Sequence, residues 1–381
     1  MAENNFNPEY MKRAIELAKK GMGAVNPNPL VGAVIVKDGH IIGEGYHRRY
    51  GELHAERDAF THLTEGAEGA ELYVTLEPCC HHGKQPPCVD AIIAHGIKCV
   101  YCGSDDPNEL VAGGGFKRLK EAGIDVVTHC MKEACDSINE VFFHYIVHKT
   151  PYVVMKYAMT MDGKIATFKG ESKWITGEKS RSYVMELRNR LMGIMVGIGT
   201  VIADDPMLTC RMEGGRNPIR IICDSRLSIP MDSRIVKTAK DVRTIVVSAK
   251  MIDKVSTENS CVINKKTYEE KKKQLFEAGV EIIETESADG HVNLKQLMTI
   301  LGNMGIDSIL LEGGSCLNDS AIEAGIVNEV DVFVAPKIFG GDGTYTPVGG
   351  RGVEMPDDAH MFSLVDITRI GEDVLLKYKR F

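Results

Sequence analysis

A histidine, a glutamate and two cysteines lie at spacings that suit a zinc site. His54-x-Glu56 is followed by the pair Pro78-Cys79 and, after a loop, by Cys88. Imidazole nitrogen and thiolate sulfur are ligands that zinc prefers, and three protein ligands leave one position open for water. A nearby carboxylate that does not bind the metal can move protons. The pattern therefore predicts hydrolytic zinc chemistry with Glu56 as the proton carrier.

Two simpler interpretations compete with this one. Free cysteines are most often buried core residues, but the segment 78–88 is rich in proline, histidine and glycine and is typical of a surface loop. A structural zinc site would use a fourth protein ligand, and Cys80, His81 and His82 could supply one. Glu56 and a domain large enough to fold without a metal favour the catalytic site.

The elements around these residues alternate between strands and helices. A helix is expected after Asn7-Pro8, and a hairpin turning on Asp38-Gly39 joins strands at 30–36 and 41–46. Helices are then expected at 54–63 and 87–95, and strands at 71–76 and 97–102. This succession predicts an α/β sandwich with His54 at the start of one helix.

Composition limits the size, the environment and the partners of the protein. A chain of 381 residues with 44% hydrophobic content predicts two domains. A net charge of −8 argues against a nucleic-acid partner and favours a small-molecule substrate. The eleven cysteines are an odd number, and no signal-peptide pattern or membrane span is evident, so a cytoplasmic enzyme with no membrane partner is expected. A homo-oligomer is compatible with this interpretation.

The second half of the chain repeats the alternation of strands and helices. An amphipathic helix is expected over 131–148, and Lys149-Thr150-Pro151 places the boundary between domains 1–149 and 150–381. The sequence then predicts helices at 178–190, 268–278 and after Gly314, and strands at 152–158, 193–197, 219–224, 244–248 and 308–312. No Gly-x-Gly-x-x-Gly follows the first strand, so a Rossmann cofactor site is not supported.

The spacing of the cysteines departs from the general zinc-deaminase signature. That signature places the second cysteine three residues after the first, whereas Cys88 follows Cys79 by nine. With this longer loop the chain resembles the family of bifunctional riboflavin-biosynthesis deaminase/reductases, through segments 28–32, 54–56, 75–88 and 106–108 with Gly113 and Gly115. Segments 172–174, 196–211 and 309–315 resemble its reductase half.

The resemblance implies a fold and a site for each half. The N-terminal half would be a cytidine-deaminase-like α/β/α sandwich, and the C-terminal half a dihydrofolate-reductase-like α/β domain. Zinc would bind His54, Cys79 and Cys88, with Glu56 as the proton shuttle. Implied substrate contacts in the deaminase are Asn28, His81, Lys84, Asp106 and Asn108.

For the reductase half the resemblance implies NADPH as the cofactor. The implied cofactor positions are Ala158, Trp174, Thr200, Asp204, Gly314, Ser315, Cys316, Leu317, Asn318, Asp319 and Ser320. The implied substrate positions are Ser172, Arg188, Leu208, Arg211 and Glu312. Arginine suits a ribose phosphate because its guanidinium can bind phosphate through two hydrogen bonds. Lys156 and Glu312 are the ionisable candidates for supplying a proton, and we take Lys156 as the catalytic residue.

The implied function is deamination of 2,5-diamino-6-(5-phosphoribosylamino)pyrimidin-4(3H)-one, followed by NADPH-dependent reduction of the ribosyl group to ribityl. One alternative is a nucleoside or tRNA deaminase fused to an unrelated reductase, which the acidic charge and the nine-residue spacing disfavour. Another is a non-catalytic nucleotide-binding protein with structural zinc, which would unfold when a chelator removes the metal.

Overall fold

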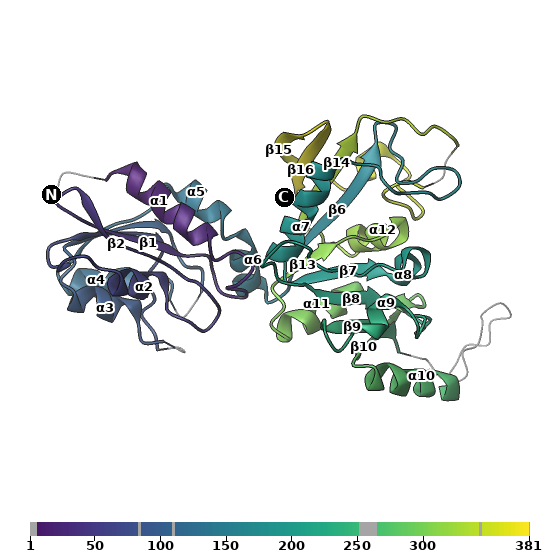
Figure 1. The fold of residues 1–381 in the computed structure, drawn as a ribbon, viewed down its shortest axis with the longest axis horizontal. Helices are drawn as coiled ribbons and strands as arrows, with labels where there is room; N and C mark the ends of the chain where they lie inside the picture. Colours follow the sequence, from purple (N-terminus) through teal and green to yellow (C-terminus); the bar gives the residue numbers. More distant parts are fainter. Residues whose placement is uncertain (1–5, 83–84, 109–110, 251–264, 343–344, 381) are drawn as a thin grey trace. The chain divides into compact units, whose positions relative to one another are not determined.

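The structure is a computed structural model that describes residues 6–82, 85–108, 111–250, 265–342 and 345–380. The chain divides into two compact units, Met1–Lys149 and Thr150–Phe381 (Figure 1). Each unit is described by itself. Among the described residues, no helix is both long enough and apolar enough to cross a membrane.

A five-stranded mixed sheet forms the centre of the first unit. Its strands lie in the order β2-β1-β3-β4-β5, with β1 antiparallel to both neighbours and β3, β4 and β5 parallel. They are β1 (Gly32–Lys37), β2 (His40–Tyr46), β3 (Glu71–Leu76), β4 (Cys99–Ser104) and β5 (Asp125–Val127). The expected turn at Asp38-Gly39 joins β1 to β2, and both residues have the positive φ that such a turn requires.

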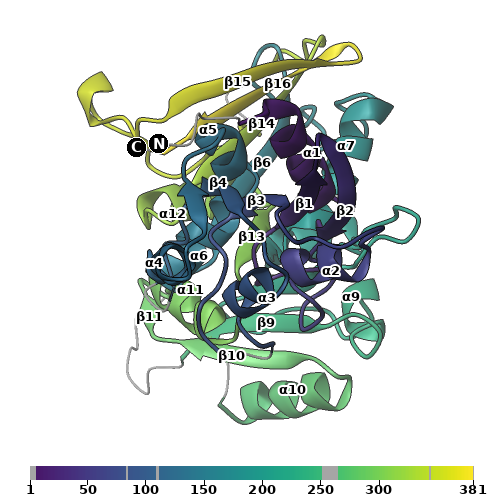
Figure 2. The same cartoon turned by 90° about the vertical axis from the view of Figure 1, so that its left-hand side faces the viewer.

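Helices cover both faces of this sheet. On one face α2, α3 and α4 pack through Phe60, Ile92 and Leu119. On the other, α1 and α5 pack through Met11 and Cys135. The helices are α1 (Pro8–Lys19), α2 (Ala55–Thr61), α3 (Cys88–Ala94), α4 (Gly114–Glu121), α5 (Lys132–Ser137) and α6 (Glu140–His148). Figure 2 shows the sheet between the two layers, which confirms the expected α/β sandwich.

The single helix expected over 131–148 is instead two helices, α5 and α6. Asn139 lies between them and is only 2% exposed. Its side chain accepts a hydrogen bond from the backbone N–H of Leu30 and donates one to the Leu30 carbonyl. The expectation was wrong because an amphipathic pattern does not reveal a side chain that must turn toward a distant backbone segment.

A nine-stranded sheet forms the centre of the second unit. The order is β10-β9-β8-β7-β13-β6-β14-β16-β15. Neighbouring strands from β10 to β14 are parallel, and β16 is antiparallel to both of its neighbours, β14 and β15. The bounds are β6 (Tyr152–Thr160), β7 (Gly193–Gly197), β8 (Ile219–Cys223), β9 (Thr244–Ala249), β10 (Glu281–Thr285), β13 (Ser308–Leu311), β14 (Glu329–Ala335), β15 (Ser363–Ile370) and β16 (Asp373–Lys379). A separate two-stranded sheet contains β11 (Ser287–Ala288) and β12 (His291–Val292).

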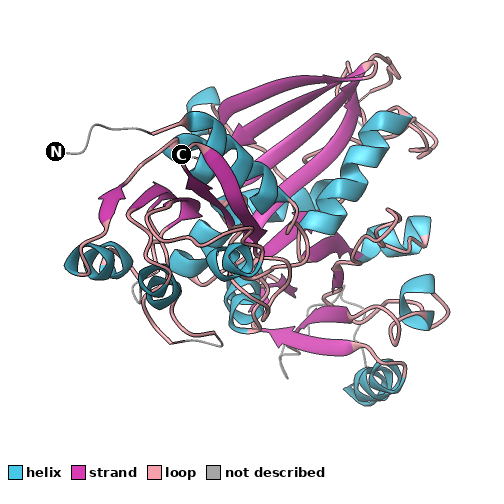
Figure 3. Cartoon of the chain, turned by 60° about the vertical axis from the view of Figure 1, so that its left-hand side comes forward, coloured by secondary structure: helices cyan, strands magenta, loops and turns pink. Residues whose placement is uncertain are grey.

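Helices lie on both faces of this sheet as well, and Figure 3 shows strands and helices throughout the chain. One face packs against α11 and α12, through residues such as Leu297 and Ala321. The other packs against α7 through Val184, which contacts Phe333 and Leu375. The elements are α7 (Glu178–Arg190), α8 (Ile198–Asp204), α9 (Arg234–Lys237), α10 (Lys265–Glu277), α11 (Leu294–Asn303), α12 (Ser315–Glu323) and the 3-10 helix η1 (Pro356–Asp358).

Candidate active sites

The start of α2 and the segment after β3 bring the predicted metal ligands together. His54 is the residue that caps α2, and Cys79 lies three residues after the end of β3. Cys88 is the first residue of α3. The distances from His54 Nδ1 are 3.5 Å to Cys79 Sγ and 3.4 Å to Cys88 Sγ. All three ligand atoms lie within 4.8 Å of one another, so one ion can contact all three.

The protonation of this group suits a metal site. The hydrogen bond from Cys88 lowers the pKa of Cys79 to about 4, and His54 acts in the same direction. Cys79 is therefore a thiolate, the form that binds metal. One imidazole nitrogen and two sulfurs are a donor set typical of zinc. Cys80 is not part of this group, and its side chain packs against the core of the sandwich.

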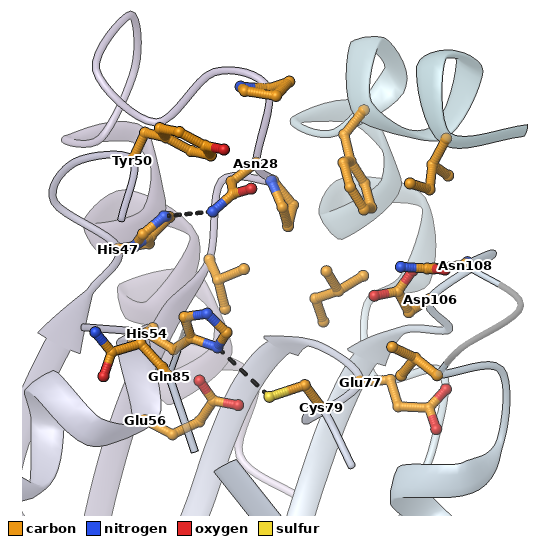
Figure 4. Close-up of a pocket in the computed structure, with 18 of the residues that line it drawn as sticks. Asn28, His47, Tyr50, His54, Glu56, Glu77, Cys79, Gln85, Asp106 and Asn108 are labelled. Atoms are coloured by element: carbon orange, nitrogen blue, oxygen red, sulfur yellow. Dashed lines mark hydrogen bonds between the residues drawn. The ribbon is translucent and has the colours of Figure 1, made fainter. Parts of the chain in front are cut away.

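Glu56 lies beside the three ligands on the first turn of α2. It is 3% exposed, and burial raises its pKa. In Figure 4 its carboxylate points toward the space between His54 and Cys79. A buried carboxyl group of raised pKa can both accept and release a proton near neutral pH.

Two of the ligands, His54 and Cys79, line a cavity of about 330 Å³, and Glu56 lines it beside them. Asn28 lies on one wall, and Asp106 and Asn108 lie on the opposite wall (Figure 4). His81 lines the same cavity, and its Nδ1 is buried without a hydrogen-bond partner among the described residues. The structure thus gathers four of the five predicted substrate residues; the fifth, Lys84, lies outside the described residues.

Three further residues that line this cavity were missed in the sequence. His47 is buried, and its Nδ1 donates to the Leu53 carbonyl, so its Nε2 accepts a hydrogen bond from Asn28 at 3.1 Å. This contact orients the Asn28 carboxamide. Phe142 and Tyr145 of α6 also line the cavity. The pattern of apolar residues in α6 indicated a packed face, but it could not indicate which surface that face covers.

In the second unit, β6 and β13 place Lys156 beside Glu312. The two strands are parallel, with Leu311 opposite Met155. The next residues along each strand therefore come together, and Lys156 Nζ lies 3.8 Å from Glu312 Oε2. Arg188 of α7 donates to both carboxylate oxygens of Glu312, from Nε at 2.9 Å and from Nη2 at 3.0 Å.

Arg188 has a different environment from the one expected of a phosphate ligand. Its side chain is largely buried, and Nη1 donates to the carbonyl of Thr209 in addition to the two bonds to Glu312. Most of its hydrogen-bonding capacity is used within the protein. Arg211 is exposed and Leu208 is buried, while Ser172 lies on the loop before Trp174. Arg211 is therefore the better placed of the two arginines for a substrate phosphate.

The predicted cofactor residues lie on several elements of the second unit. Thr200 and Asp204 are on α8, which follows β7, and Ala158 is on β6 beside Lys156. Asp204 pairs with Lys173 at 3.4 Å, next to Trp174, which is 61% exposed.

Within α12 the predicted residues differ in accessibility. Gly314 caps the helix and Cys316 is exposed. Leu317 packs against the core, and Asn318 is buried and donates to the carbonyl of Pro347. Asp319 faces Gly350, where an added Cβ would lie about 2.1 Å from the carboxylate. Ser320 is exposed, a turn further along the helix. The start of the helix, 314–316, is thus partly exposed, and its backbone N–H groups are of the kind that can bind a cofactor phosphate.

Comparison with known proteins gives a consistent result over the whole chain. Residues 4–104 match the cytidine and deoxycytidylate deaminase zinc-binding region, and residues 151–376 match the RibD C-terminal domain. The riboflavin biosynthesis protein RibD of Actinobacillus pleuropneumoniae is 51% identical over 97% of this chain and 94% of its own length. The Escherichia coli protein of the same name is 38% identical over 96% of this chain and 97% of its own.

Solved structures agree with these matches. The diaminohydroxyphosphoribosylaminopyrimidine deaminase/5-amino-6-(5-phosphoribosylamino)uracil reductase of Thermotoga maritima has a TM-score of 0.83 at 38% identity, covering 98% of both chains. Acinetobacter baumannii RibD has a TM-score of 0.84 at 33% identity, with the same coverage. The two fold classes and the two activities expected from the sequence are thereby confirmed. The chain belongs to the RibD family of bifunctional riboflavin-biosynthesis enzymes, which combine a deaminase domain with a reductase domain.

Proposed function

We propose that residues 1–149 form the zinc-dependent deaminase and residues 150–381 the NADPH-dependent reductase. The deaminase would act on 2,5-diamino-6-(5-phosphoribosylamino)pyrimidin-4(3H)-one, and the reductase would convert the resulting 5-amino-6-(5-phosphoribosylamino)uracil to the ribitylamino phosphate. The observation that carries this proposal is the group His54, Cys79 and Cys88 at the side of a cavity that His54 and Cys79 line, with Glu56 buried beside it.

The deaminase chemistry depends on what these four residues can hold and move. His54, Cys79 and Cys88 would hold zinc, which when bound supplies an activated water and a Lewis acid. Glu56 takes a proton on its carboxylate as the carbon–oxygen bond forms, and gives it to the departing amine as the carbon–nitrogen bond breaks. Water is consumed, ammonia leaves, and a ring carbonyl remains.

The cavity walls support a pyrimidine substrate. The carboxamide of Asn28, oriented by His47, can pair with the donors and acceptors on one edge of the ring. Asp106 and Asn108 face it from the other wall (Figure 4). The unpartnered Nδ1 of His81 is a further polar atom that a ligand could satisfy. Lys84 stays a predicted phosphate contact.

The reductase chemistry requires a hydride and a proton. NADPH, when bound, supplies the hydride to the open-chain aldehyde carbon. Lys156 would then give a proton to the developing alkoxide, which yields an alcohol. Burial opposes ionisation of Glu312, but the charges of Arg188 and Lys156 lower its pKa to about 2. Glu312 therefore stays a carboxylate at neutral pH, which supports Lys156 as the donor.

We further propose a cytoplasmic enzyme that takes a small-molecule substrate, uses no nucleic acid or membrane partner, and forms a homo-oligomer. The net charge of −8 supports the small substrate. The outer strand of the large sheet, β15, exposes Leu364, Val365 and Ile367, and an apolar sheet edge of this kind can pair with another chain. Light scattering of the purified protein tests the oligomer, and a monomer at all concentrations would contradict it.

One experiment tests both activities together. The zinc-loaded protein is incubated with the diaminopyrimidine substrate with and without NADPH, while ammonia and cofactor absorbance are followed. Ammonia release is expected in both samples, and cofactor oxidation is expected only after ammonia appears. Free cytidine and tRNA serve as control substrates. Deamination of either control at a comparable rate, with none of the diaminopyrimidine, would contradict the proposal.

A further inference from the structure

Glu77 is a buried carboxylate between the metal-binding segment and the loop that carries two predicted substrate residues. It directly follows β3, precedes Cys79 by two residues, and is 4% exposed. Its backbone N–H donates to the carbonyl of Ser104, the last residue of the neighbouring strand β4, at 2.9 Å. This bond ties the start of the metal segment to the end of the next strand. A buried carboxylate needs partners for its own oxygens as well.

The start of α4 supplies those partners. Glu77 Oε2 accepts a hydrogen bond from the N–H of Gly113 at 3.1 Å. Oε1 accepts bonds from the N–H groups of Gly115 at 3.0 Å and Phe116 at 3.4 Å. The residue that caps α4 is Gly113, which has no side chain to satisfy these groups itself. Glu77 thus caps α4 from another part of the chain, where the helix dipole also favours negative charge.

The glycines at this helix start show how closely the two segments approach. A Cβ added to Gly115 would lie 2.2 Å from the carbonyl oxygen of Pro78. A Cβ added to Gly114 would lie 2.8 Å from Cys80 Sγ. The first turn of α4 therefore rests directly on Pro78 and Cys80, the residues on either side of Cys79. This observation is independent of the hydrogen bonds, and it describes the same contact.

The segment that carries Asp106 and Asn108 is held on both sides by Glu77. The Glu77 backbone N–H is bonded to Ser104, two residues before Asp106, and the Glu77 carboxylate accepts a hydrogen bond from Gly113. Asp106 and Asn108 lie on this loop and face the cavity. In Figure 4 the Glu77 carboxylate lies on the far side of Cys79 from Glu56, so it is not directed at the reacting atoms.

We propose that Glu77 is a positioning residue of the deaminase, which fixes the wall carrying Asp106 and Asn108 relative to the metal ligands. This inference rests on the proposed deaminase function. Without the carboxylate, three backbone N–H groups lose their acceptor and the loop is no longer held at its Gly113 end. Substrate binding should then weaken, whereas the metal ligands and Glu56 keep their own contacts.

The test compares Glu77→Gln with Glu71→Gln, a matched change at the other end of the same strand. Glutamine has the same shape and keeps one accepting oxygen, but its NH2 group would face a backbone N–H donor and cannot accept its hydrogen bond. We expect Glu77→Gln to raise the KM of deamination by about tenfold or more, as other residues that support a site do. Its kcat should change less than KM, and zinc should remain at one per chain. Hydrogen exchange of peptides covering 105–116 should be faster. Glu71→Gln should have the KM, kcat and hydrogen exchange of the wild type. The reductase activity of both variants should also equal that of the wild type.

Other results would overturn the proposal. If KM and the exchange of 105–116 are unchanged in Glu77→Gln, the carboxylate does not position the loop. If zinc is lost and kcat falls at constant KM, Glu77 supports the metal rather than the substrate wall. Glu77→Asp, whose carboxylate is one methylene shorter, should show the same KM defect; full activity in that variant would also count against the proposal. A wild-type protein that releases no ammonia would instead refute the proposed function.

Discussion

Arg188 holds Glu312 through two parallel hydrogen bonds, although the two residues are 124 positions apart in the chain. The pair keeps Glu312 ionised, with a pKa of about 2, and Lys156 lies 3.8 Å from the same carboxylate. The pair also fixes α7 to the end of β13. Glu312 is therefore placed to orient Lys156, the residue that we propose as the proton donor.

This relationship predicts different outcomes for two substitutions. Lys156→Met should lower kcat of the reductase by about 10²–10⁴, the range typical of a lost general acid. Glu312→Gln keeps hydrogen-bond acceptance toward Arg188 and should cost less. Steady-state kinetics with the deaminated substrate and NADPH measure both, and ammonia release in the same preparations serves as the folding control. Full reductase activity in Lys156→Met would show that the proton comes from elsewhere.

Arg57 predicts an effect on metal affinity. It lies on α2 beside Glu56 and donates from Nε to the carbonyl of Pro86 at 3.1 Å and from Nη2 to that of Pro87 at 2.9 Å. These two bonds hold the residues just before Cys88. Arg57→Lys cannot span both carbonyls, so zinc should bind about tenfold more weakly or worse. Competition with a chromophoric chelator gives the affinity. Arg243→Lys in the second unit is the control, and equal zinc affinities in the two variants would contradict the prediction.

Asp331 predicts a dependence of stability on pH. It is fully buried between Lys377 and Glu329, and burial raises its pKa to about 7. An aspartate of raised pKa stabilises the folded state below its unfolded pKa of ~4, and this contribution is lost as pH rises through about 7. The free energy of unfolding of the wild type should therefore fall by roughly 2–4 kcal/mol between pH 4 and 8 because of Asp331. In Asp331→Asn this decrease should be absent.

The measurement for Asp331 is urea unfolding at several pH values, followed by the fluorescence of Trp174. This is the single tryptophan of the chain, and it lies in the same unit as Asp331. The variant should be more stable than the wild type at pH 8 and similar to it at pH 4. Glu281→Gln, a change at an exposed ion pair with Arg243, is the control. A variant less stable than the wild type at pH 8 would show that the Asp331 charge is favourable.

Cys316 allows the cofactor site to be tested without turnover. It is exposed at the start of α12, among the residues predicted to bind NADPH. Bound cofactor should shield it, so alkylation should slow about tenfold when NADPH is present at ten times its Kd. Mass spectrometry of the zinc-loaded protein resolves the labelled peptide, and Cys210 is the comparison thiol. If NADPH leaves the labelling rate of Cys316 unchanged, the cofactor does not cover this helix start.

The first site could largely be predicted from the sequence because its chemistry is local. His54-x-Glu56 and the loop from Cys79 to Cys88 carry their roles in residue type and spacing, and the Asp38-Gly39 turn carries its own geometry. What the sequence could not show are contacts between distant segments. The Asn139 side chain that divides 131–148 into two helices bonds to Leu30, and no local pattern reveals that partner.

The second site was harder to predict for the same reason. The family resemblance suggested a phosphate contact for Arg188, and only the packing of α7 shows that this arginine is bound to Glu312. Glu77 gave no signal either, because its partners are backbone N–H groups 36 to 39 residues further along the chain.

The central claim is that one chain carries two independent active sites, and Glu56→Gln tests it most directly. The substitution keeps the shape of the side chain and removes its ability to carry a proton. Ammonia release from the diaminopyrimidine should fall by at least about 10², with one zinc per chain retained, while NADPH-dependent reduction of the deaminated compound stays at the wild-type rate. Parallel loss of reduction in a folded, zinc-loaded variant would contradict the two-site account.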